Sequence, residues 1–229
     1  MNDDVVAASP FDALSRQNLS ESAYRQIRNA LAQSRLKSGQ KLVLRSLAEQ
    51  LGISATPVRE ALLRLGSEGI VQFDSRGTAF VPEMTLQRYL EIRDLRLWLE
   101  GQAGLRAVET VNDADIERLS AIHERMAEAE KNQDSALALE MNGQFHLHLC
   151  TLARMPMLLQ FVENLWVQCG PAMGALYEVS PPRDPEGHQH LAVLRGLVER
   201  DGQAVRKAIE RDIVVGGQRL AQLLSQPKP

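Results

Sequence analysis

The sequence has few of the features that would place it in a specialised class of protein. Its 229 residues include two cysteines, Cys150 and Cys169, which are too few for a disulfide framework and match no thiolate metal motif. No apolar run approaches the roughly 20 residues that cross a bilayer, and the first residues are acidic where a signal peptide needs positive charge. We therefore expect a cytoplasmic protein without a membrane partner.

Charge is distributed unevenly along the chain. The net charge of −3 does not by itself indicate a nucleic-acid partner. Residues 17–83, however, carry nine Lys and Arg residues against six acidic residues, whereas the rest of the chain is acidic. The length suits one large or two modest domains, and the asymmetry favours a basic module joined to a neutral or acidic one.

The N-terminal part of the sequence predicts helices followed by a hairpin. A mobile tail is expected over residues 1–18, followed by a first helix. A second short helix ends at Gly52, and a third has Thr56 as its cap and Pro57 at its first helical position. The runs IVQFD and TAFVP on either side of SRG predict a β-hairpin. This order of elements predicts a winged helix-turn-helix domain over residues 19–82.

The remainder of the chain has no strand pattern. Pro82 marks a boundary, and Thr85 caps a helical stretch that runs to about Val108. Further helices are predicted at about residues 113–131, 134–153, 156–178, 186–200 and 203–224. Residues 83–229 are therefore expected to form an all-α helical bundle, which makes the fold mainly α.

The third helix and the hairpin carry side chains suited to DNA. In a helix-turn-helix, the recognition helix contacts base edges with its N-terminal residues, while neighbouring groups contact phosphates. An arginine beside a glycine at a hairpin tip has the length and clearance to enter a minor groove. The candidate DNA-binding residues are Arg45, Ser54, Thr56, Arg59, Arg76 and Gly77, and Arg64 is also able to reach the flanking backbone. The alternative is that these are ordinary solvated side chains of a small helical domain.

The segment LAEQLGISATPVREALLRLGSEGIV resembles the DNA-binding signature of GntR-type bacterial transcription regulators. The resemblance spans residues 23–81 and implies a homodimer on a pseudo-palindromic double-stranded DNA operator. At the family's DNA-contact positions stand Arg45, Ser54, Thr56, Arg59 and Gly77. Where the family commonly has a base-reading arginine, this chain has Ala55. Because a bidentate arginine contributes about 1–3 kcal/mol of discrimination at one base pair, we expect the operator to differ from the family's usual one.

Several polar residues in the predicted bundle occupy positions where helical periodicity expects apolar core. Asn142 and His146 are four residues apart and share a helix face. His190 and Asp212 lie on the apolar stripes of two later helices. Imidazole and carboxylate ligands suit a divalent transition metal such as zinc, nickel or manganese. The alternative is a hydrogen-bonded core without a metal.

The other three histidines, His123, His148 and His188, are expected at the surface, with His188 as a weaker substitute for His190.

Residues 85–223 resemble the all-helical FCD effector domain of FadR-like GntR regulators. The family's metal-binding pattern has Asp-x-x-x-His, then a His at the start of a late helix and a His in the last helix. This chain matches it at His146 and His190 but has Asn142 for the Asp and Asp212 for the last His. The total charge of the ligands stays at −1, so the resemblance implies a metal site of altered affinity and metal preference.

In the same resemblance, the motif RLWLE places Arg96 at a position that faces the effector cavity in relatives. A guanidinium there would clamp the carboxylate of a small organic acid. The alternative is an ion pair within the helix with Glu100, four residues on. Trp166, Met173 and Tyr177 are expected either to line the same pocket or to be plain core.

These features predict a DNA-binding transcription regulator whose operator binding is controlled by a small organic acid with the help of a metal. One alternative is a metal-independent sensor of a long apolar ligand such as an acyl thioester, as in some FadR-like relatives. Another is a helical metalloenzyme in which His146, His190 and Asp212 activate a water for hydrolysis. The sequence has no nucleophile motif and no phosphate-binding loop, which weighs against an enzyme.

Overall fold

The computed structural model describes residues 19–179 and 188–226 of the chain. The mobile tail expected over residues 1–18 lies outside the described residues, as do residues 180–187, which include the predicted start of the helix at about residues 186–200. In chain order the elements are α1 (Leu19–Ala32), β1 (Lys41–Leu42), α2 (Leu44–Leu51), α3 (Ala55–Ser67), β2 (Gln72–Phe73), β3 (Ala79–Phe80), α4 (Leu86–Ala107), α5 (Asp113–Lys131), α6 (Ser135–Leu152), α7 (Pro156–Val179), α8 (Gln189–Val198) and α9 (Gly202–Leu224). Within these ranges no helix is long and apolar enough to cross a membrane.

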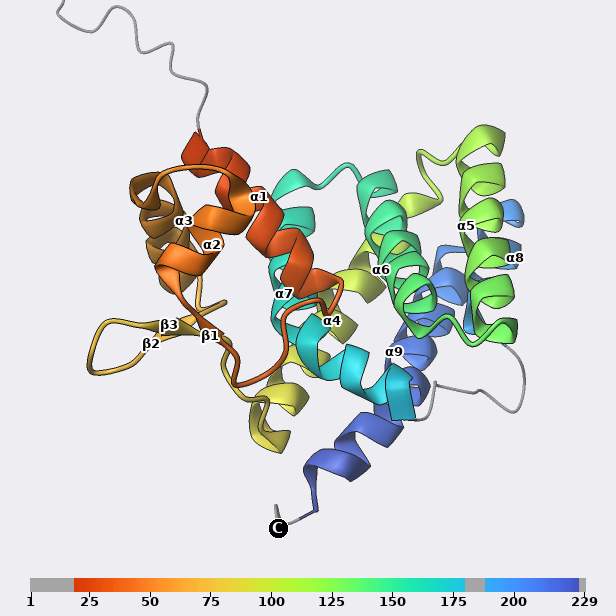
Figure 1. Ribbon diagram of the computed structural model, residues 1–229. Coiled ribbons are helices and arrows are strands. Elements are labelled where there is room, and N and C mark those ends of the chain that lie inside the picture. The colour runs from red at the N-terminus through yellow and green to blue at the C-terminus, as the bar shows by residue number, and fades with distance from the viewer. Residues whose placement is uncertain (1–18, 180–187, 227–229) are drawn as a thin grey trace, which may run out of the picture.

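The short helices and the small sheet form a winged helix-turn-helix, and the long helices form an all-α bundle beside it (Figure 1). The predicted fold class is therefore confirmed. The sheet is antiparallel with the order β1-β3-β2, so Phe80 pairs with Lys41 on one side and Gln72 on the other. In the turn between β2 and β3, the carboxylate of Asp74 accepts a hydrogen bond from the backbone N–H of Arg76 at 2.9 Å. Strand β1 was not predicted, because two residues are too few to show an alternating pattern.

Helix α3 begins two residues earlier than predicted. Thr56 was expected to be its cap, but the N-cap residue is Ser54 and the helix starts at Ala55. Pro57 therefore stands at the third helical position. Its missing N–H is tolerated there, because the first four N–H groups of a helix have no partner within it. Helix α2 ends as predicted, with Gly52 in the left-handed conformation at φ 65°.

Most bundle helices follow their predicted bounds because their caps are local. The Thr85 side chain accepts a backbone hydrogen bond at the start of α4, and Asn112 and Asp115 form a reciprocal capping box at the start of α5. Helix α8 is shorter than predicted, and the chain turns away at Arg200, whose φ is +57°. Helix α4 packs against α6, α7 and α9, which places it at the centre of the bundle.

The winged helix-turn-helix is seated on α7 through α1. Val167 of α7 is part of the apolar core of the winged domain. One turn further, Gly170 allows backbone contact, since a Cβ at this position would collide with the carbonyl oxygen of Leu31 and lie 2.8 Å from that of Ala32. Gly170 therefore lets the end of α1 lie directly on α7.

Candidate metal centre and nucleic-acid interface

Polar side chains from three helices converge inside the bundle. Helix α6 supplies His146, α8 supplies His190 and α9 supplies Asp212, and one potential ligand atom from each lies within 4.8 Å of the others. Asn142, one turn before His146, lines a cavity together with Asp212. The structure therefore brings His146, His190 and Asp212 together and places Asn142 at the adjoining cavity.

His146 lies between two carboxylates and is 1% exposed. Its Nδ1 is 2.5 Å from Glu100 Oε2, and its Nε2 is 3.0 Å from Asp212 Oδ2. Burial alone would lower the pKa of His146, but the charges of Glu100 and Asp212 and their hydrogen bonds outweigh burial and raise it. The two carboxylates thus fix the orientation of this ring.

His190 is equally buried but has no comparable hydrogen bonds. Its ring stacks on Phe145 with the centroids 3.7 Å apart and the planes at 6°. Within the described part of the chain, neither of its ring nitrogens has a hydrogen-bond partner, and Nε2 is 3.8 Å from Asp212 Oδ1. Burial lowers the pKa of His190 to about 3, so the ring is neutral and its unprotonated nitrogen is free to coordinate.

Asp212 completes a group that can hold a metal ion. Burial alone would raise the pKa of Asp212, but the neighbouring His190 and His146 hold it well below the usual range, so the side chain is ionised. Its oxygens lie 3.0 Å and 3.8 Å from the nearer nitrogens of the two histidines. Ligand atoms around a tetrahedral zinc ion are roughly 3.4 Å apart, so these side chains fit a metal of this size with small adjustments.

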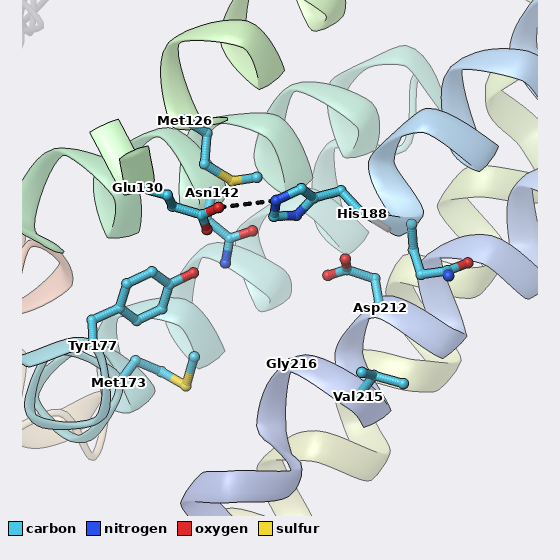
Figure 2. Close-up of a pocket in the computed structure, with 10 residues that line it drawn as sticks. Met126, Glu130, Asn142, Met173, Tyr177, His188, Asp212, Val215 and Gly216 are labelled. Atoms are coloured by element: carbon cyan, nitrogen blue, oxygen red, sulfur yellow. Dashed lines mark ion pairs between the residues drawn. The ribbon is translucent and has the colours of Figure 1, made fainter. Parts of the chain in front are cut away.

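A small cavity of about 40 Å³ adjoins this group. Tyr177 and Asp212 point into it from opposite sides, and Asn142 lies between them (Figure 2). At the edge of the cavity, His188 Nε2 is 2.9 Å from Glu130 Oε2. His188 therefore pairs with an acid and does not belong to the candidate metal ligands His146, His190 and Asp212. Met173 also lines the cavity, which was one of the two alternatives for this residue.

Arg96 adopts the ion pair that was the alternative to effector binding. Its Nε donates to Glu100 Oε1 at 2.6 Å, and its guanidinium carbon lies 4.0 Å from the ring centroid of Trp166. Neither Arg96 nor Trp166 lines the cavity. Trp166 belongs to an apolar core cluster, whereas Met173 and Tyr177 line the cavity. Effector contact by Arg96 stays a prediction that requires the guanidinium to leave Glu100.

Two buried residues near the cluster were missed by the sequence analysis. Glu100 was considered only as a partner of Arg96, yet it is fully buried and contacts His146. The signal was its spacing, because Glu100 precedes the buried Ala103 and Ala107 by three and seven residues. His123 was expected at the surface but is 7% exposed, since it shares a helix face with the buried Leu119.

Four of the six candidate DNA-binding residues line one groove of the winged domain, and the other two are exposed at the start of α3. A groove between α3, β1 and the wing is lined by Lys41, Arg45, Arg59, Arg76, Gly77 and Thr78 together with apolar residues, and none of the described residues that line it is acidic. Ser54 and Thr56 are exposed at the N-terminus of α3, and no hydrogen bond from the Ser54 side chain caps the helix. This surface can contact a polyanion with four cationic side chains and a helix N-terminus.

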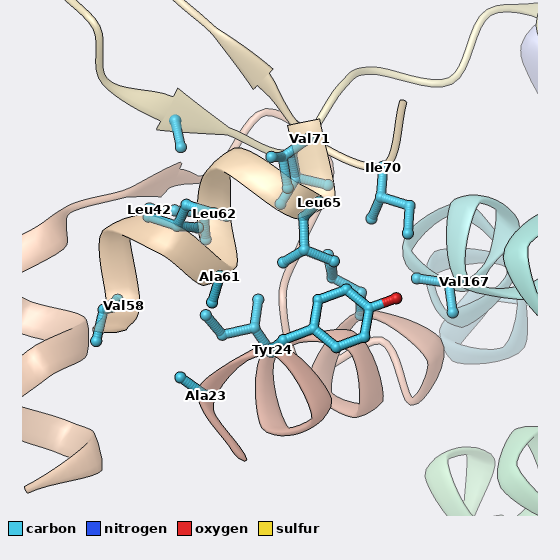
Figure 3. Close-up of a cluster of buried hydrophobic side chains, with 14 of the residues drawn as sticks. Ala23, Tyr24, Leu42, Val58, Ala61, Leu62, Leu65, Ile70, Val71 and Val167 are labelled. Atoms are coloured by element: carbon cyan, nitrogen blue, oxygen red, sulfur yellow. The ribbon is translucent and has the colours of Figure 1, made fainter. Parts of the chain in front are cut away.

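The inner face of α3 is fixed by the core of the winged domain. Val58, Ala61, Leu62 and Leu65 point into this core opposite α1, and Val167 of α7 reaches it from the bundle (Figure 3). The outer face of α3, which carries Arg59, is therefore held in a defined orientation.

Arg64, which was expected near the DNA backbone, is engaged elsewhere. Its guanidinium pairs with Glu21 at 2.6 Å and Glu68 at 3.2 Å and lies 3.7 Å from the ring centroid of Tyr24. It joins α1 to α3 and is absent from the basic groove.

Comparisons with known proteins agree with both halves of this description. Residues 19–81 match the family described as bacterial regulatory proteins, gntR family, and residues 91–214 match the FCD domain. The chain is 34% identical over 186 residues to the HTH-type transcriptional regulator McbR of Escherichia coli strain K12, covering 80% of this chain and 84% of McbR. It is 22% identical to the HTH-type transcriptional repressor RspR of the same strain, covering 86% of each protein.

Solved structures show the same architecture. The structure of E. coli McbR/YncC superposes with a TM-score of 0.84 at 31% identity, covering 90% of this chain and 98% of that one. A GntR regulator from Rhodococcus sp. RHA1 shares the fold, with a TM-score of 0.73 at 17% identity over 91% of this chain and 99% of that one. These relatives are transcription regulators and not enzymes. The chain belongs to the GntR family of bacterial DNA-binding transcription regulators, in the FadR-like group that carries an FCD domain.

Proposed function

We propose that this regulator is a homodimer whose operator binding is controlled by a small organic acid bound at a metal in the FCD domain. The observation that carries the proposal is His190, a buried imidazole whose ring nitrogens both lack a hydrogen-bond partner among the described residues. An unpartnered buried polar group is costly unless a ligand satisfies it. The nearby His146 and Asp212 supply further ligand atoms for a metal ion.

The donor set suits a divalent transition metal. His146, His190 and Asp212 would hold the ion, and the Asn142 amide oxygen would be a further ligand. Two imidazoles with oxygen ligands are compatible with zinc, nickel or manganese. When bound, such a metal supplies the positive charge that attracts a carboxylate ligand.

Charges at the cavity favour recognition of an acid with a metal over recognition without one. Among the residues that the structure describes, those that line the cavity include Glu130 and Asp212 but no Lys or Arg. A carboxylate entering the cavity would be repelled by these acids unless a cation reverses the local charge. Arg96, paired with Glu100, is not at the cavity to do so.

The two alternative functions receive less support. The cavity volume of about 40 Å³ holds a few water molecules, at roughly 10–15 Å³ each, and is too small for an acyl chain. An acyl sensor would therefore require the helices to separate. The relatives are transcription regulators, which gives no support to a hydrolytic metalloenzyme.

A homodimer would place two basic grooves on a pseudo-palindromic double-stranded DNA operator in the cytoplasm. In each protomer Arg59 at the recognition helix would contact bases, while Arg45, Ser54 and Thr56 would contact phosphates and Arg76 beside Gly77 the minor groove. Two copies would match half-sites about one helical turn apart.

The proposal is tested by operator binding with and without metal. An operator selected from random duplexes is titrated with protein in the presence of a chelator or of zinc, in each case without acid and with each of a panel of small carboxylic acids. We expect at least one acid to change the operator Kd only when zinc is present, and His190→Ala to abolish this change. By linkage, that acid must bind free and operator-bound protein with affinities that differ by the same factor. Equal affinity of every acid for both forms would contradict the proposal.

A further inference from the structure

Glu100 occupies an unusual position for a carboxylate. It is 0% exposed at the centre of the bundle, on α4, and both of its oxygens are engaged. Oε1 accepts hydrogen bonds from Arg96 Nε at 2.6 Å and from Trp166 Nε1 at 3.2 Å. Oε2 lies 2.5 Å from Nδ1 of His146 on α6. The carboxylate therefore connects an ion pair within its own helix to a histidine of another helix.

The contact with Oε2 has a consequence for the His146 ring. An ionised carboxylate is only an acceptor, so Nδ1 of His146 carries the hydrogen. The other nitrogen, Nε2, then faces Asp212 at 3.0 Å, on the side where the ligand atoms of His190 and Asp212 converge. A carboxylate behind a ligating imidazole is the usual device that fixes the ring and increases its basicity.

A purely structural role for Glu100 would explain less of this geometry. Neutralising Arg96 needs one carboxylate oxygen, and Oε1 already makes that contact. The second oxygen is turned to His146, and the guanidinium carbon of Arg96 lies 4.0 Å from the ring centroid of Trp166. Arg96 and Trp166 thus hold the carboxylate in place while Oε2 holds the histidine.

We infer that Glu100 is a positioning residue of the metal centre, which commits Nε2 of His146 to the metal, and that Arg96 and Trp166 hold Glu100 in that role. The inference rests on the proposed function, because it is directed at the proposed metal. In this inference Arg96 supports the metal ligand His146 through Glu100 and does not contact an effector directly.

The test compares metal affinity in variants of the full chain. Glu100→Gln keeps the size of the side chain and removes its charge, and we expect zinc and cobalt to bind about 10- to 100-fold more weakly. Glu100→Gln alone leaves the buried Arg96 without its carboxylate partner. If this variant does not fold, metal affinity is measured in the double variant Arg96→Met with Glu100→Gln, which leaves no unpaired buried charge. Glu210→Gln is the matched control, since Arg206 and Glu210 form an ion pair of the same spacing, with Arg206 Nε 2.7 Å from Glu210 Oε1. The control is expected to bind metal like the wild type.

A spectroscopic measurement separates positioning from stability. In zinc-loaded wild type, long-range ¹H–¹⁵N correlation spectra should show His146 protonated at Nδ1 and coordinated through Nε2. In the Glu100 variants the Nδ1–H should exchange rapidly or the coordinating nitrogen should change. If wild type binds zinc through His190 while all variants keep the same affinity and the same His146 signals, the role of Glu100 is refuted and the metal site stands. If wild type itself binds no metal in a His190-dependent manner, the proposed function fails together with the inference.

Discussion

His190 lies flat on Phe145, with ring centroids 3.7 Å apart and an angle of 6° between the ring planes. The stack fixes the imidazole deep in the bundle, where it is 1% exposed. Stacking on an apolar ring supplies no hydrogen-bond partner, and neither ring nitrogen has one among the residues that the structure describes. This arrangement makes His190 a sensitive position for both protonation and metal binding.

Protonation of His190 should make the metal-free protein less stable in mild acid. The pKa of His190 is lowered by burial to about 3 in the folded protein, against 6.5 in the unfolded chain. Below pH 6.5 the unfolded chain binds a proton that the folded protein does not, so the free energy of unfolding falls as the pH falls. The slope from this one group is at most about 1.4 kcal/mol per pH unit.

The measurement is urea unfolding between about pH 5 and 6.5 with a chelator present. In this range His146, whose pKa is raised, is protonated in the folded protein, and Glu100, whose pKa is lowered to about 2, stays ionised. Burial also lowers the pKa values of His123 and His148, which changes the free energy of unfolding in the same direction, so His190→Leu should reduce the pH dependence without abolishing it. An unchanged slope in His190→Leu would show that His190 is not the group responsible.

Arg59→Ala should relax the sequence preference of the regulator. Arg59 is exposed in the basic groove on the outer face of α3, and loss of a bidentate base contact costs about 1–3 kcal/mol at one base pair. The motif selected from random duplexes should lose information at the corresponding positions. Arg64→Ala is the control, because Arg64 pairs with Glu21 and Glu68 away from the groove. The Arg59 assignment is wrong if both variants select the wild-type motif.

Gly170→Ala should disturb the seat of the winged domain on the bundle. The added methyl group would meet the backbone of Leu31 and Ala32, which is unable to move aside like a flexible side chain. We expect a loss of about 1–3 kcal/mol in the free energy of unfolding, as for other overpacked sites. Gly216→Ala on α9 meets no atom within 4 Å and should be neutral or stabilising by up to about 1 kcal/mol. Equal effects of the two substitutions on thermal unfolding would contradict this close approach.

Local signals allowed the sequence to predict most of the fold. Caps such as Thr85 and the Asn112–Asp115 capping box act within four residues, so helix bounds near them were predicted closely. Helix α3 was misplaced by two residues, because Ser54 and Thr56 are both suitable caps and sequence pattern alone does not choose between them.

The candidate site was predictable only in part. Helical spacing placed Asn142 and His146 on one face and His190 and Asp212 on the apolar stripes of two later helices, and the family resemblance assigned all four to one metal site. The contact between Glu100 and His146 joins residues 46 positions apart, and no periodicity within either helix reports such a pairing. The pairing of Arg96 with Glu100 was foreseen as an alternative, but the choice between it and effector contact depends on how α4 is rotated against α6 and α7.

Metal content per chain is the measurement that bears most directly on the proposed centre. Untagged wild type and His190→Ala, purified side by side, are analysed by elemental mass spectrometry, because a polyhistidine tag would itself bind metal. We predict a stoichiometric divalent transition metal in the wild type, held by His146, His190 and Asp212, and its loss in the variant. The proposed metal centre would be contradicted by a wild type that remains metal-free after exposure to zinc, nickel and manganese and that has the same metal content as His190→Ala.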